Sequence, residues 1–483
     1  MSQLPKSPES FDCNNPQSIF DYTSRLIGHS LSSLFGDEVT RQHRKGKGGL
    51  GQMVEEMFFG YKVNSNPEAD FAGAHLELKC TPLKRSGKNN ELTIKERLVC
   101  SMIDYAEIAT TAFEDSHLIA KCRLMLLLFY LYTRDRDICE YEFIYRVLWQ
   151  LPEKDLILIK RDYETIAEKV RKGQAHLISE GDTLYLGACR KGQKGDSPQT
   201  QPFSDIKAFR RAFSLKPSYM RYVLQHVVGS ADGSYSNYRR LGNAEFELTD
   251  AKALQSESFE DIILRRFSPY YGLNYVEICD RLGVAPYQSK SKYADVSNLI
   301  VSEKKSKRIS ASDEFLKSGI ILKTVRLRAN GMPKESMAFK NIDYCEVFEN
   351  DSWPDSEAYE IFTSRFMFVV FTPSDGEISF EDRTGKIIRE QSYVLSKVFF
   401  WTMAAEDLEN ARAYWESIRR AVIENKIELG SFWSISDDRD FHVRPKAQTK
   451  IKSIAVNPNG GYCEKFCYWM NARYVKQIID SES

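Results

Sequence analysis

The sequence predicts a mixed α/β (α+β) protein with two domains that share one fold, and three observations support this prediction. The chain has 483 residues, more than a single hydrophobic core normally organises. In its first half, segments with the apolar spacing of helices alternate with segments of strand character. Three short segments of the first half also have similar counterparts in the second half, in the same order.

Two helices and two strands are predicted in the first part of the chain. Residues 18–37 and 50–60 place apolar side chains at helical intervals, and the second segment ends at a glycine. Residues 74–82 alternate in the manner of a strand. Residues 124–132 are continuously apolar, which favours a central buried strand, with a buried helix as the alternative.

The next part of the chain completes the first domain. Residues 155–172 and 217–228 are amphipathic and predict helices, and residues 183–188 predict a short strand between them. The polar stretch 229–243 has the composition of a linker. We therefore expect a first domain at residues 1–235, a linker at 236–255 and a second domain at 256–483.

The second half repeats the first in outline. Residues 320–327 resemble 76–83, residues 441–448 resemble 186–193, and residues 468–476 resemble 212–220. The gap from Lys79 to Arg190 is also close to the gap from Lys323 to Arg444. One such match carries no weight, but three matches in order predict a duplicated fold.

Composition predicts a globular cytoplasmic protein. No apolar stretch is long enough for a membrane helix and the polar start has no signal core, so we expect neither a membrane partner nor secretion. The ten cysteines lack zinc-type spacing, which predicts reduced thiols. The 67 basic and 67 acidic residues cancel, which argues against a nucleic-acid partner. Residues 188–221 nevertheless hold eight Lys and Arg against two acids, so a positive surface remains available.

Asp70, Glu77 and Lys79 are the leading candidates for catalysis. Phosphodiester hydrolysis needs a hard cation such as Mg²⁺, which carboxylates bind, and a positive group near the attacking water. Strand alternation places Glu77 and Lys79 on one face, and the preceding turn can bring Asp70 alongside. The same pattern also arises by chance, so a solvent-facing pair on an edge strand is the competing interpretation.

The segment before Asp70 supports the catalytic interpretation. Glycines at the start of the helix predicted at 50–60 let the backbone approach a phosphate, and Lys47 adds positive charge there. Glu55 lies at the polar edge of this helix. The competing interpretation is a flexible basic loop followed by an exposed acid.

Several motifs resemble the MutH family, which includes a mismatch-repair nickase and type II restriction endonucleases that cut at GATC. The similar segments of the first half include KGGLGQMVEE (47–56), ADFAGAHLELKCTP (69–82) and TIKERLVCSMIDY (93–105). Those of the second half, which the nickase lacks, include KESMAFK (334–340), NDSWPDSEAYE (350–360) and HVRPKAQ (442–448). The resemblance implies two MutH-like restriction-endonuclease folds in tandem, each with a PD-(D/E)xK core.

The resemblance also implies roles for single residues in the first domain. Asp70, Glu77 and Lys79 take the catalytic positions, with Asp70 and Glu77 as Mg²⁺ ligands and Glu55 as a supporting acid. The positions that bind DNA are taken by Lys47, Arg190, Lys191, Ser214 and Lys216. Ser214 stands where the nickase carries a tyrosine that senses adenine methylation, which favours a restriction enzyme over a nickase.

The second domain is expected to be catalytically degenerate. Ile321 stands where Glu77 stands in the first copy, and isoleucine cannot bind Mg²⁺. Arg444, Lys446 and the aromatic segment around Trp469 remain, and they are expected to bind DNA. The resemblance implies an allosteric DNA-binding role for this domain.

The sequence therefore predicts a type II restriction endonuclease that cleaves double-stranded DNA at GATC with Mg²⁺. One active site per chain implies a dimer on DNA, since both strands must be reached. Two alternatives stay open: a MutH-like nickase of hemimethylated GATC, and a DNA-binding reader of modified sites that does not cut.

Overall fold

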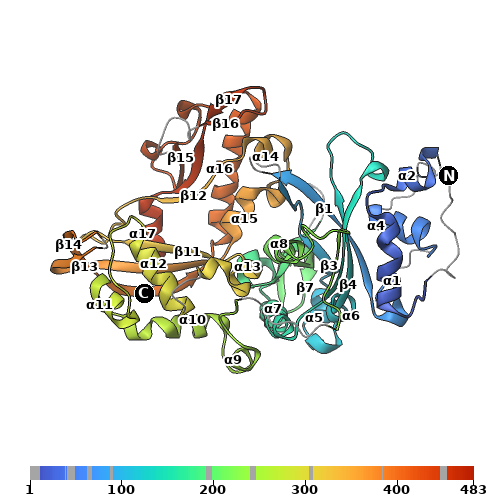
Figure 1. The fold of residues 1–483 in the computed structure, drawn as a ribbon, viewed down its shortest axis with the longest axis horizontal. Helices are drawn as coiled ribbons and strands as arrows, with labels where there is room; N and C mark the ends of the chain where they lie inside the picture. The colour runs from blue at the N-terminus through green and yellow to red at the C-terminus, as the bar shows by residue number, and fades with distance from the viewer. Residues whose placement is uncertain are drawn as a thin grey trace. The chain divides into compact units, whose positions relative to one another are not determined.

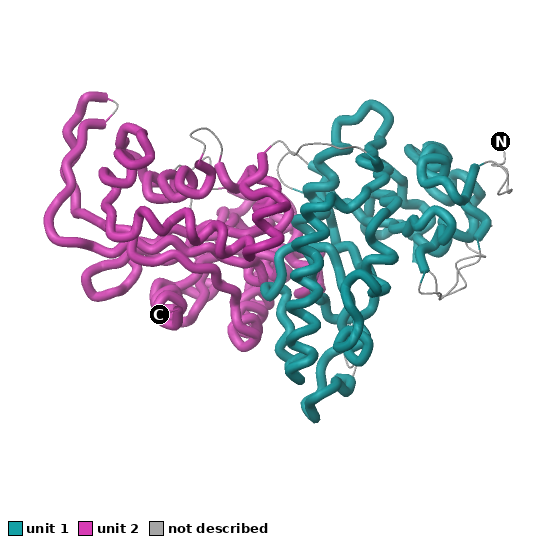
Figure 2. The backbone as a smooth tube through the Cα atoms, turned by 90° about the horizontal axis from the view of Figure 1, so that it is seen from below, with its two compact units in different colours: residues 1–245 teal, residues 246–483 magenta. Residues whose placement is uncertain are grey.

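The computed structural model divides the chain into two compact units, residues 1–245 and 246–483, drawn in teal and magenta in Figure 2. The boundary lies inside the segment 236–255 that was predicted as a linker. Leu248 is buried and its backbone N–H donates to Glu314 of unit 2, so this part of the predicted linker is folded into unit 2. The structure describes residues 11–38, 40, 49–61, 68–86, 91–191, 198–239, 246–303, 308–382, 384–445 and 454–482.

Short helices begin unit 1. The helix predicted at 18–37 is interrupted, because Ile27 is extended and Gly28 has a φ of 79°. The helix predicted at 50–60 is present, and its second half is a π-helical turn at Val54–Phe58. The helices here are α1 (Pro16–Tyr22), α2 (Leu31–Phe35) and α4 (Leu50–Met53).

The main sheet of unit 1 has the strand order β10-β5-β4-β1-β2. Figure 1 labels β1 and β4 of this sheet. β1 is parallel to β4, and β4 is antiparallel to β5. β4 is central and buried from Leu124 to Phe129, which confirms the buried strand predicted at 124–132 and excludes the helix alternative. The strands are β1 (Glu77–Ser86), β2 (Glu91–Ile94), β4 (Leu124–Leu131), β5 (Phe143–Gln150) and β10 (Ser234–Ser236).

A second, three-stranded sheet of unit 1 has the order β3-β9-β6, so β9 is its central strand. Its strands are β3 (Leu98–Met102), β6 (Leu186–Arg190) and β9 (Arg211–Leu215), and a hairpin of β7 (Gln199–Gln201) and β8 (Ser204–Ala208) connects the last two. The remaining helices are α5 (Tyr105–Ile108), α6 (His117–Cys122), α7 (Glu153–Arg171) and α8 (Pro217–Gln225).

Unit 2 starts with helices and continues into two three-stranded sheets, β11-β13-β14 and β12-β18-β15. The first helices are α9 (Ala251–Ser256), α10 (Phe259–Phe267), α11 (Tyr275–Leu282), α12 (Lys292–Ser302) and α13 (Asp313–Ser318). The strands are β11 (Ile321–Arg326), β12 (Met337–Asn341), β13 (Phe366–Glu381), β14 (Ile387–Trp401), β15 (Phe441–Pro445), β16 (Ile454–Val456), β17 (Tyr462–Glu464) and β18 (Phe466–Met470). The later helices are α14 (Tyr344–Glu349), α15 (Glu357–Thr363), α16 (Ala405–Ile423) and α17 (Ala472–Ser481).

Ten elements of unit 1 have counterparts in unit 2 that follow in the same order. The series β1, β3, α5, α6, β4, β5, α7, β6, β9, α8 in unit 1 matches β11, β12, α14, α15, β13, β14, α16, β15, β18, α17 in unit 2. The strand directions match as well, because β11 is parallel to β13 and β13 is antiparallel to β14. Helix caps fall at equivalent places, with Ser116 at the start of α6 and Ser356 at the start of α15.

The register of the paired strands shifts one of the correspondences that sequence similarity suggested by one residue. Leu215 lies opposite both Leu98 and Leu186, and Met470 lies opposite both Met337 and Phe441. Leu215 and Met470 are therefore counterparts. It follows that the counterpart of Ser214 is Trp469, one position away from the match that residue similarity gave.

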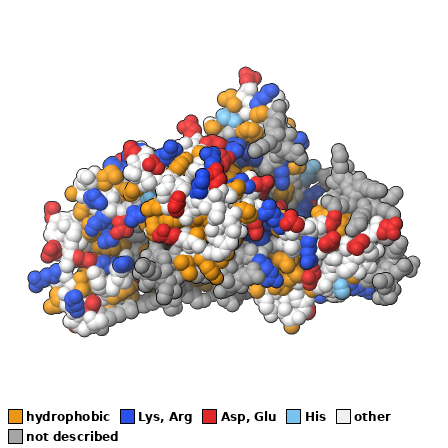
Figure 3. Space-filling model, turned by 90° about the horizontal axis from the view of Figure 1, so that it is seen from above, with side chains coloured by type: hydrophobic (Ala, Val, Ile, Leu, Met, Phe, Trp, Pro, Cys, Tyr) orange, Lys and Arg blue, Asp and Glu red, His pale blue; other side chains and the backbone are white. Residues whose placement is uncertain are grey.

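Several general features agree with the composition. All ten cysteines carry free thiols. Basic and acidic side chains are interspersed on the face drawn in Figure 3. Within the described residues, no helix combines the length and the apolar character needed to cross a membrane.

Candidate active site

A tight turn brings Asp70 beside the start of β1. Residues 72–74 form a 3₁₀ turn and His75 is left-handed, with a φ of 49°. Phe71 and Leu76 pair across this turn through two backbone hydrogen bonds of 3.0 and 3.3 Å. The chain therefore doubles back, and β1 begins at Glu77, later than the strand predicted from residue 74.

The side chains of Asp70 and Glu77 are fixed by this turn. Asp70 Oδ2 accepts a hydrogen bond of 2.9 Å from the backbone N–H of Leu78. The backbone N–H of Asp70 donates to Glu77 Oε2 at 3.3 Å. The two carboxyl groups therefore lie next to each other, as the sequence predicted for a turn that brings Asp70 alongside the strand.

Lys79 completes this group. Its Nζ donates to Glu77 Oε1 at 2.6 Å. Glu77 is only 2% exposed, which is not what a solvent-facing surface pair would show. Burial favours a low pKa for Lys79, but the adjacent Glu77 carboxylate outweighs it and raises that pKa above its ordinary value.

Glu55 approaches the same group from the π-helical turn after α4. Burial, together with the negative charges of Asp70 and Glu77, raises the pKa of Glu55 to about 7. Burial and the charge of Glu77 also raise the pKa of Asp70. Three carboxyl groups thus share one electrostatic site, and their mutual repulsion is the kind that a bound cation relieves.

Lys121 also belongs to this group, although no pattern in the sequence indicated it. It lies in α6, which packs against β3 and β4, and its Nζ is 3.6 Å from Glu77 Oε1. Its charge also acts to lower the pKa of Asp70. More than forty residues separate Lys121 from Glu77 in the chain, so only the fold brings them together.

The oxygen donors at this site fit a magnesium ion. Mg²⁺ commonly binds one or two protein carboxylates and completes its shell with water and substrate phosphate. Asp70 and Glu77 offer two such carboxylates. Among the described residues, no group of three or more His, Cys, Asp or Glu side chains is arranged to hold a metal ion.

The DNA-binding candidates of unit 1 fall into two groups. Arg190 ends β6 and stacks on Phe209, with its guanidinium carbon 4.1 Å from the ring centre, and Lys191 follows it; both are exposed. Lys47 lies outside the described residues, as does Lys446 of unit 2. Arg190 and Lys191 are thus on the surface, where a duplex can reach them.

Ser214 and Lys216, by contrast, are buried. Ser214 is fully inaccessible in β9, the central strand of its sheet. Lys216 is 8% exposed and donates its ammonium protons to the carbonyl of Thr183, and its charge acts to lower the pKa of buried Asp162. That these side chains touch DNA stays a prediction, and in this structure protein atoms enclose both.

The corresponding positions of unit 2 have different chemistry. Ile321 starts β11, as Glu77 starts β1. Arg444 is exposed and stacks on Trp469, with 4.6 Å from the guanidinium carbon to the ring centre. Buried His442 stacks on Trp469 at 6.0 Å, and burial lowers the pKa of His442 to about 4. Unit 2 thus has an exposed arginine over the ring of a partly buried tryptophan, but no carboxylate at the start of β11.

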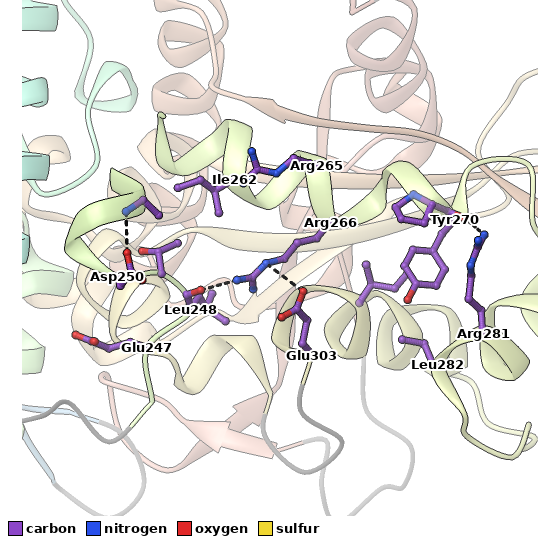
Figure 4. Close-up of a pocket in the computed structure, with 14 residues that line it drawn as sticks. Glu247, Leu248, Asp250, Ile262, Arg265, Arg266, Tyr270, Arg281, Leu282 and Glu303 are labelled. Carbon is purple, nitrogen blue, oxygen red and sulfur yellow. Dashed lines mark hydrogen bonds and ion pairs between the residues drawn. The ribbon is translucent and has the colours of Figure 1, made fainter. Parts of the chain in front are cut away.

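Unit 2 also contains a cleft of about 880 Å³, and the residues that line it fall within 247–303 of the sequence (Figure 4). Arg266 crosses it to the carbonyl of Leu248 at 2.5 Å and approaches Glu303 at 3.9 Å. The guanidinium group therefore bridges two segments that line the cleft. None of the candidate site residues lines this cleft.

Comparisons with known proteins agree with this picture. Residues 59–162 match the family model described as "DNA mismatch repair enzyme MutH". The type II restriction enzyme Sau3AI of Staphylococcus aureus is 29% identical, over 96% of this chain and 98% of its own length. The DNA mismatch repair protein MutH of Shewanella woodyi is 28% identical, over 45% of this chain and 95% of its own. MutH of Vibrio vulnificus is also 28% identical, over 43% of this chain and 91% of its own.

Proposed function

We propose that this chain, which contains a MutH-family domain, is a type II restriction endonuclease that cleaves double-stranded DNA at GATC with Mg²⁺. The observation that carries the proposal is the group of Asp70, Glu77 and Lys79 at the start of β1, inside the segment that matches the MutH model. Similarity to Sau3AI along nearly the whole chain favours restriction over repair, because the MutH relatives match less than half of it.

Each residue of the group has a distinct task in this proposal. Asp70 and Glu77 would hold Mg²⁺, and the bound ion would supply polarisation of the phosphate and a lower pKa of water. Lys79 keeps its proton, because Glu77 raises its pKa, and offers positive charge to the phosphate oxygens as negative charge builds up on them. Glu55 adds negative charge beside the ligands, and its high pKa makes that charge dependent on pH.

Unit 2 is proposed to be a second MutH-like fold that binds DNA and does not cut it. The matching series of elements supports a common fold for the two units. Ile321 at the position of Glu77 removes one expected ligand. The exposed Arg444 on Trp469 is suited to contact a base edge or a phosphate. We infer that DNA bound by unit 2 stimulates cleavage by unit 1, and that two chains combine to cut both strands.

A cleavage assay on three duplexes tests the proposal. The duplexes carry one GATC site that is unmethylated, hemimethylated or fully methylated, and product ends are mapped on both strands with and without Mg²⁺. We expect breaks in both strands of unmethylated GATC. Nicking confined to hemimethylated DNA would support the mismatch-repair alternative, and binding without any cleavage would support a reader of modified sites.

Two variants make the assay specific to the proposed site. Lys79→Ala removes the ammonium group at Glu77 and should abolish cleavage. Lys160→Ala is the matched control, because Lys160 is half-exposed on α7 of the same unit and pairs with Glu114. Equal activity of Lys79→Ala and wild type would overturn the assignment of the active site.

A further inference from the structure

Glu77 has two lysines beside it, and the proposed function uses only one. Lys79 Nζ lies 2.6 Å and Lys121 Nζ 3.6 Å from the same oxygen, Glu77 Oε1. Lys121 is about one fifth exposed, so its ammonium group is near the surface of the site without being free in solvent. Glu77 already has a close partner in Lys79, which leaves open what a second ammonium group adds.

The charge of the site gives one answer. Three carboxyl groups, Glu55, Asp70 and Glu77, face two lysines, so the ionised site is negative by one unit before a divalent cation binds. With the cation it becomes positive by one unit and can accept a phosphodiester. Without Lys121 the same site with its cation would be neutral, and its attraction for the phosphate would fall.

The second unit provides an internal comparison. Lys121 follows the cap Ser116 by five residues, and Ile361 follows the cap Ser356 by five residues. Glu77 and Lys121 thus correspond to Ile321 and Ile361, so the carboxylate and its second lysine are both replaced by isoleucine.

Lys79, however, corresponds to a lysine that unit 2 retains. Lys323 donates to the carbonyl of Ala338 at 2.6 Å and lies over the ring of Phe339 at 4.3 Å. A lysine at this position therefore has packing and hydrogen-bonding uses in a unit without the carboxylate. Lys121 has no such retained counterpart, which links its presence to the presence of Glu77.

We propose that Lys121 is a catalytic residue of unit 1 whose ammonium group binds the phosphate that is cut. This inference rests on the proposed nuclease function and adds a substrate contact to it. Lys79 stays with Glu77, while Lys121 gives the site that holds the cation its net positive charge. Removal of Lys121 should weaken cleavage about 10- to 100-fold, the range typical for residues that support a metal site.

The test compares cation binding with cleavage. Lys121→Met keeps most of the side chain and removes its charge. Calorimetry with Ca²⁺ alone should show equal or tighter cation binding, since a repelling charge is lost. Single-turnover cleavage with Mg²⁺ should be slower, and Lys121→Arg should restore it in large part. Weaker Ca²⁺ binding together with slower cleavage would overturn the proposal, because Lys121 would then only hold Glu77 in place.

A modified duplex tests the phosphate contact itself. Once the cut position has been mapped, that phosphate is replaced by a neutral methylphosphonate, and binding is measured in Ca²⁺. If Lys121 contacts this phosphate, Lys121→Met and the neutral phosphate remove the same contact. The loss of binding free energy with both changes is then smaller than the sum of the two separate losses. Separate losses of binding free energy that add up in full would show that Lys121 does not contact this phosphate. Lys160→Ala is again the control, and thermal unfolding shows whether each variant is folded.

The outcome can be separated from failure of the nuclease proposal. If wild type does not cut any duplex, the proposed function fails and Lys121 has no substrate to bind. If wild type cuts and Lys121→Met cuts equally fast, only the inference about Lys121 fails.

Discussion

The start of β1 in unit 1 and the start of β11 in unit 2 occupy the same place in the same series of elements, yet their chemistry differs. In unit 1, Glu77 has Asp70, Lys79 and Lys121 around it. In unit 2, Ile321 is followed by Lys323, whose ammonium group bonds to a backbone carbonyl.

Deeper in the two folds the same contrast continues. The buried thiols of Cys100 and Cys122 lie near Lys79, and their counterparts Phe339 and Phe362 pack edge to face at 5.6 Å. The same backbone arrangement therefore accommodates either a charged site or an apolar core at this position. A retained lysine is therefore weak support for catalysis unless the carboxylates accompany it.

The largest effect is expected for Glu77→Ile, which gives unit 1 the residue of unit 2. Loss of one of two proposed Mg²⁺ ligands should lower single-turnover cleavage by at least about 10³-fold. The variant should remain folded, since unit 2 carries isoleucine at the matching strand position. Cleavage within tenfold of wild type would show that Glu77 is not part of the active site. Ile321→Glu is the reciprocal variant and should not confer cleavage on unit 2.

Lys216→Asn tests whether buried Lys216 has an internal role or contacts DNA. Asn is the matching residue of unit 2, because Asn471 follows β18 as Lys216 follows β9. Lys216 donates to Thr183 and helps to neutralise buried Asp162. Loss of its charge should destabilise unit 1 by about 2–4 kcal/mol. Urea unfolding measures this change. A variant of wild-type stability with weakened DNA binding would restore the original expectation of a DNA contact.

The sequence predicted the parts of the fold whose signals are local. Strand β4 and the turn that joins Asp70 to β1 could both be predicted, because each depends on residues that are adjacent in the sequence. The helix predicted at 18–37 was not continuous, since Gly28 and the cap at Ser30 interrupt it. An amphipathic pattern alone does not reveal where a chain turns.

The sequence was less informative about residues that meet only in the folded chain. The packing of α6 brings Lys121 close to Glu77, and the spacing of apolar residues in the sequence does not predict where a helix packs. Ser214 and Lys216 were assigned to DNA binding by the family resemblance, yet a central strand and a carbonyl partner enclose them. Burial depends on the partner strands, which a single segment does not specify.

The arginine stack of unit 2 gives a prediction of intermediate size. Arg444→Ala should weaken DNA binding by unit 2 by about 1–3 kcal/mol, the value of a good arginine contact to a base. Cleavage of a substrate with two GATC sites should then lose its advantage over a substrate with one site. Arg412→Ala is the control, because Arg412 is exposed on α16 and pairs with Glu416 and Glu409. A two-site advantage that survives Arg444→Ala, or that is absent in wild type, contradicts the proposed stimulation.

The smallest expected effect is the pH dependence that Glu55 gives to the stability of unit 1 without metal. The pKa of Glu55 is about 7 in the folded chain, against an ordinary value of 4.5. Between these values the folded chain holds a proton that the unfolded chain releases, so the stability of unit 1 should fall as pH rises from 4.5 to 7. Above pH 7 this contribution stays constant. Glu55→Gln cannot titrate, and its thermal midpoint in chelator should depend less on pH over the same range. An unchanged slope in this variant would mean that Glu55 lies apart from the charges of Asp70 and Glu77.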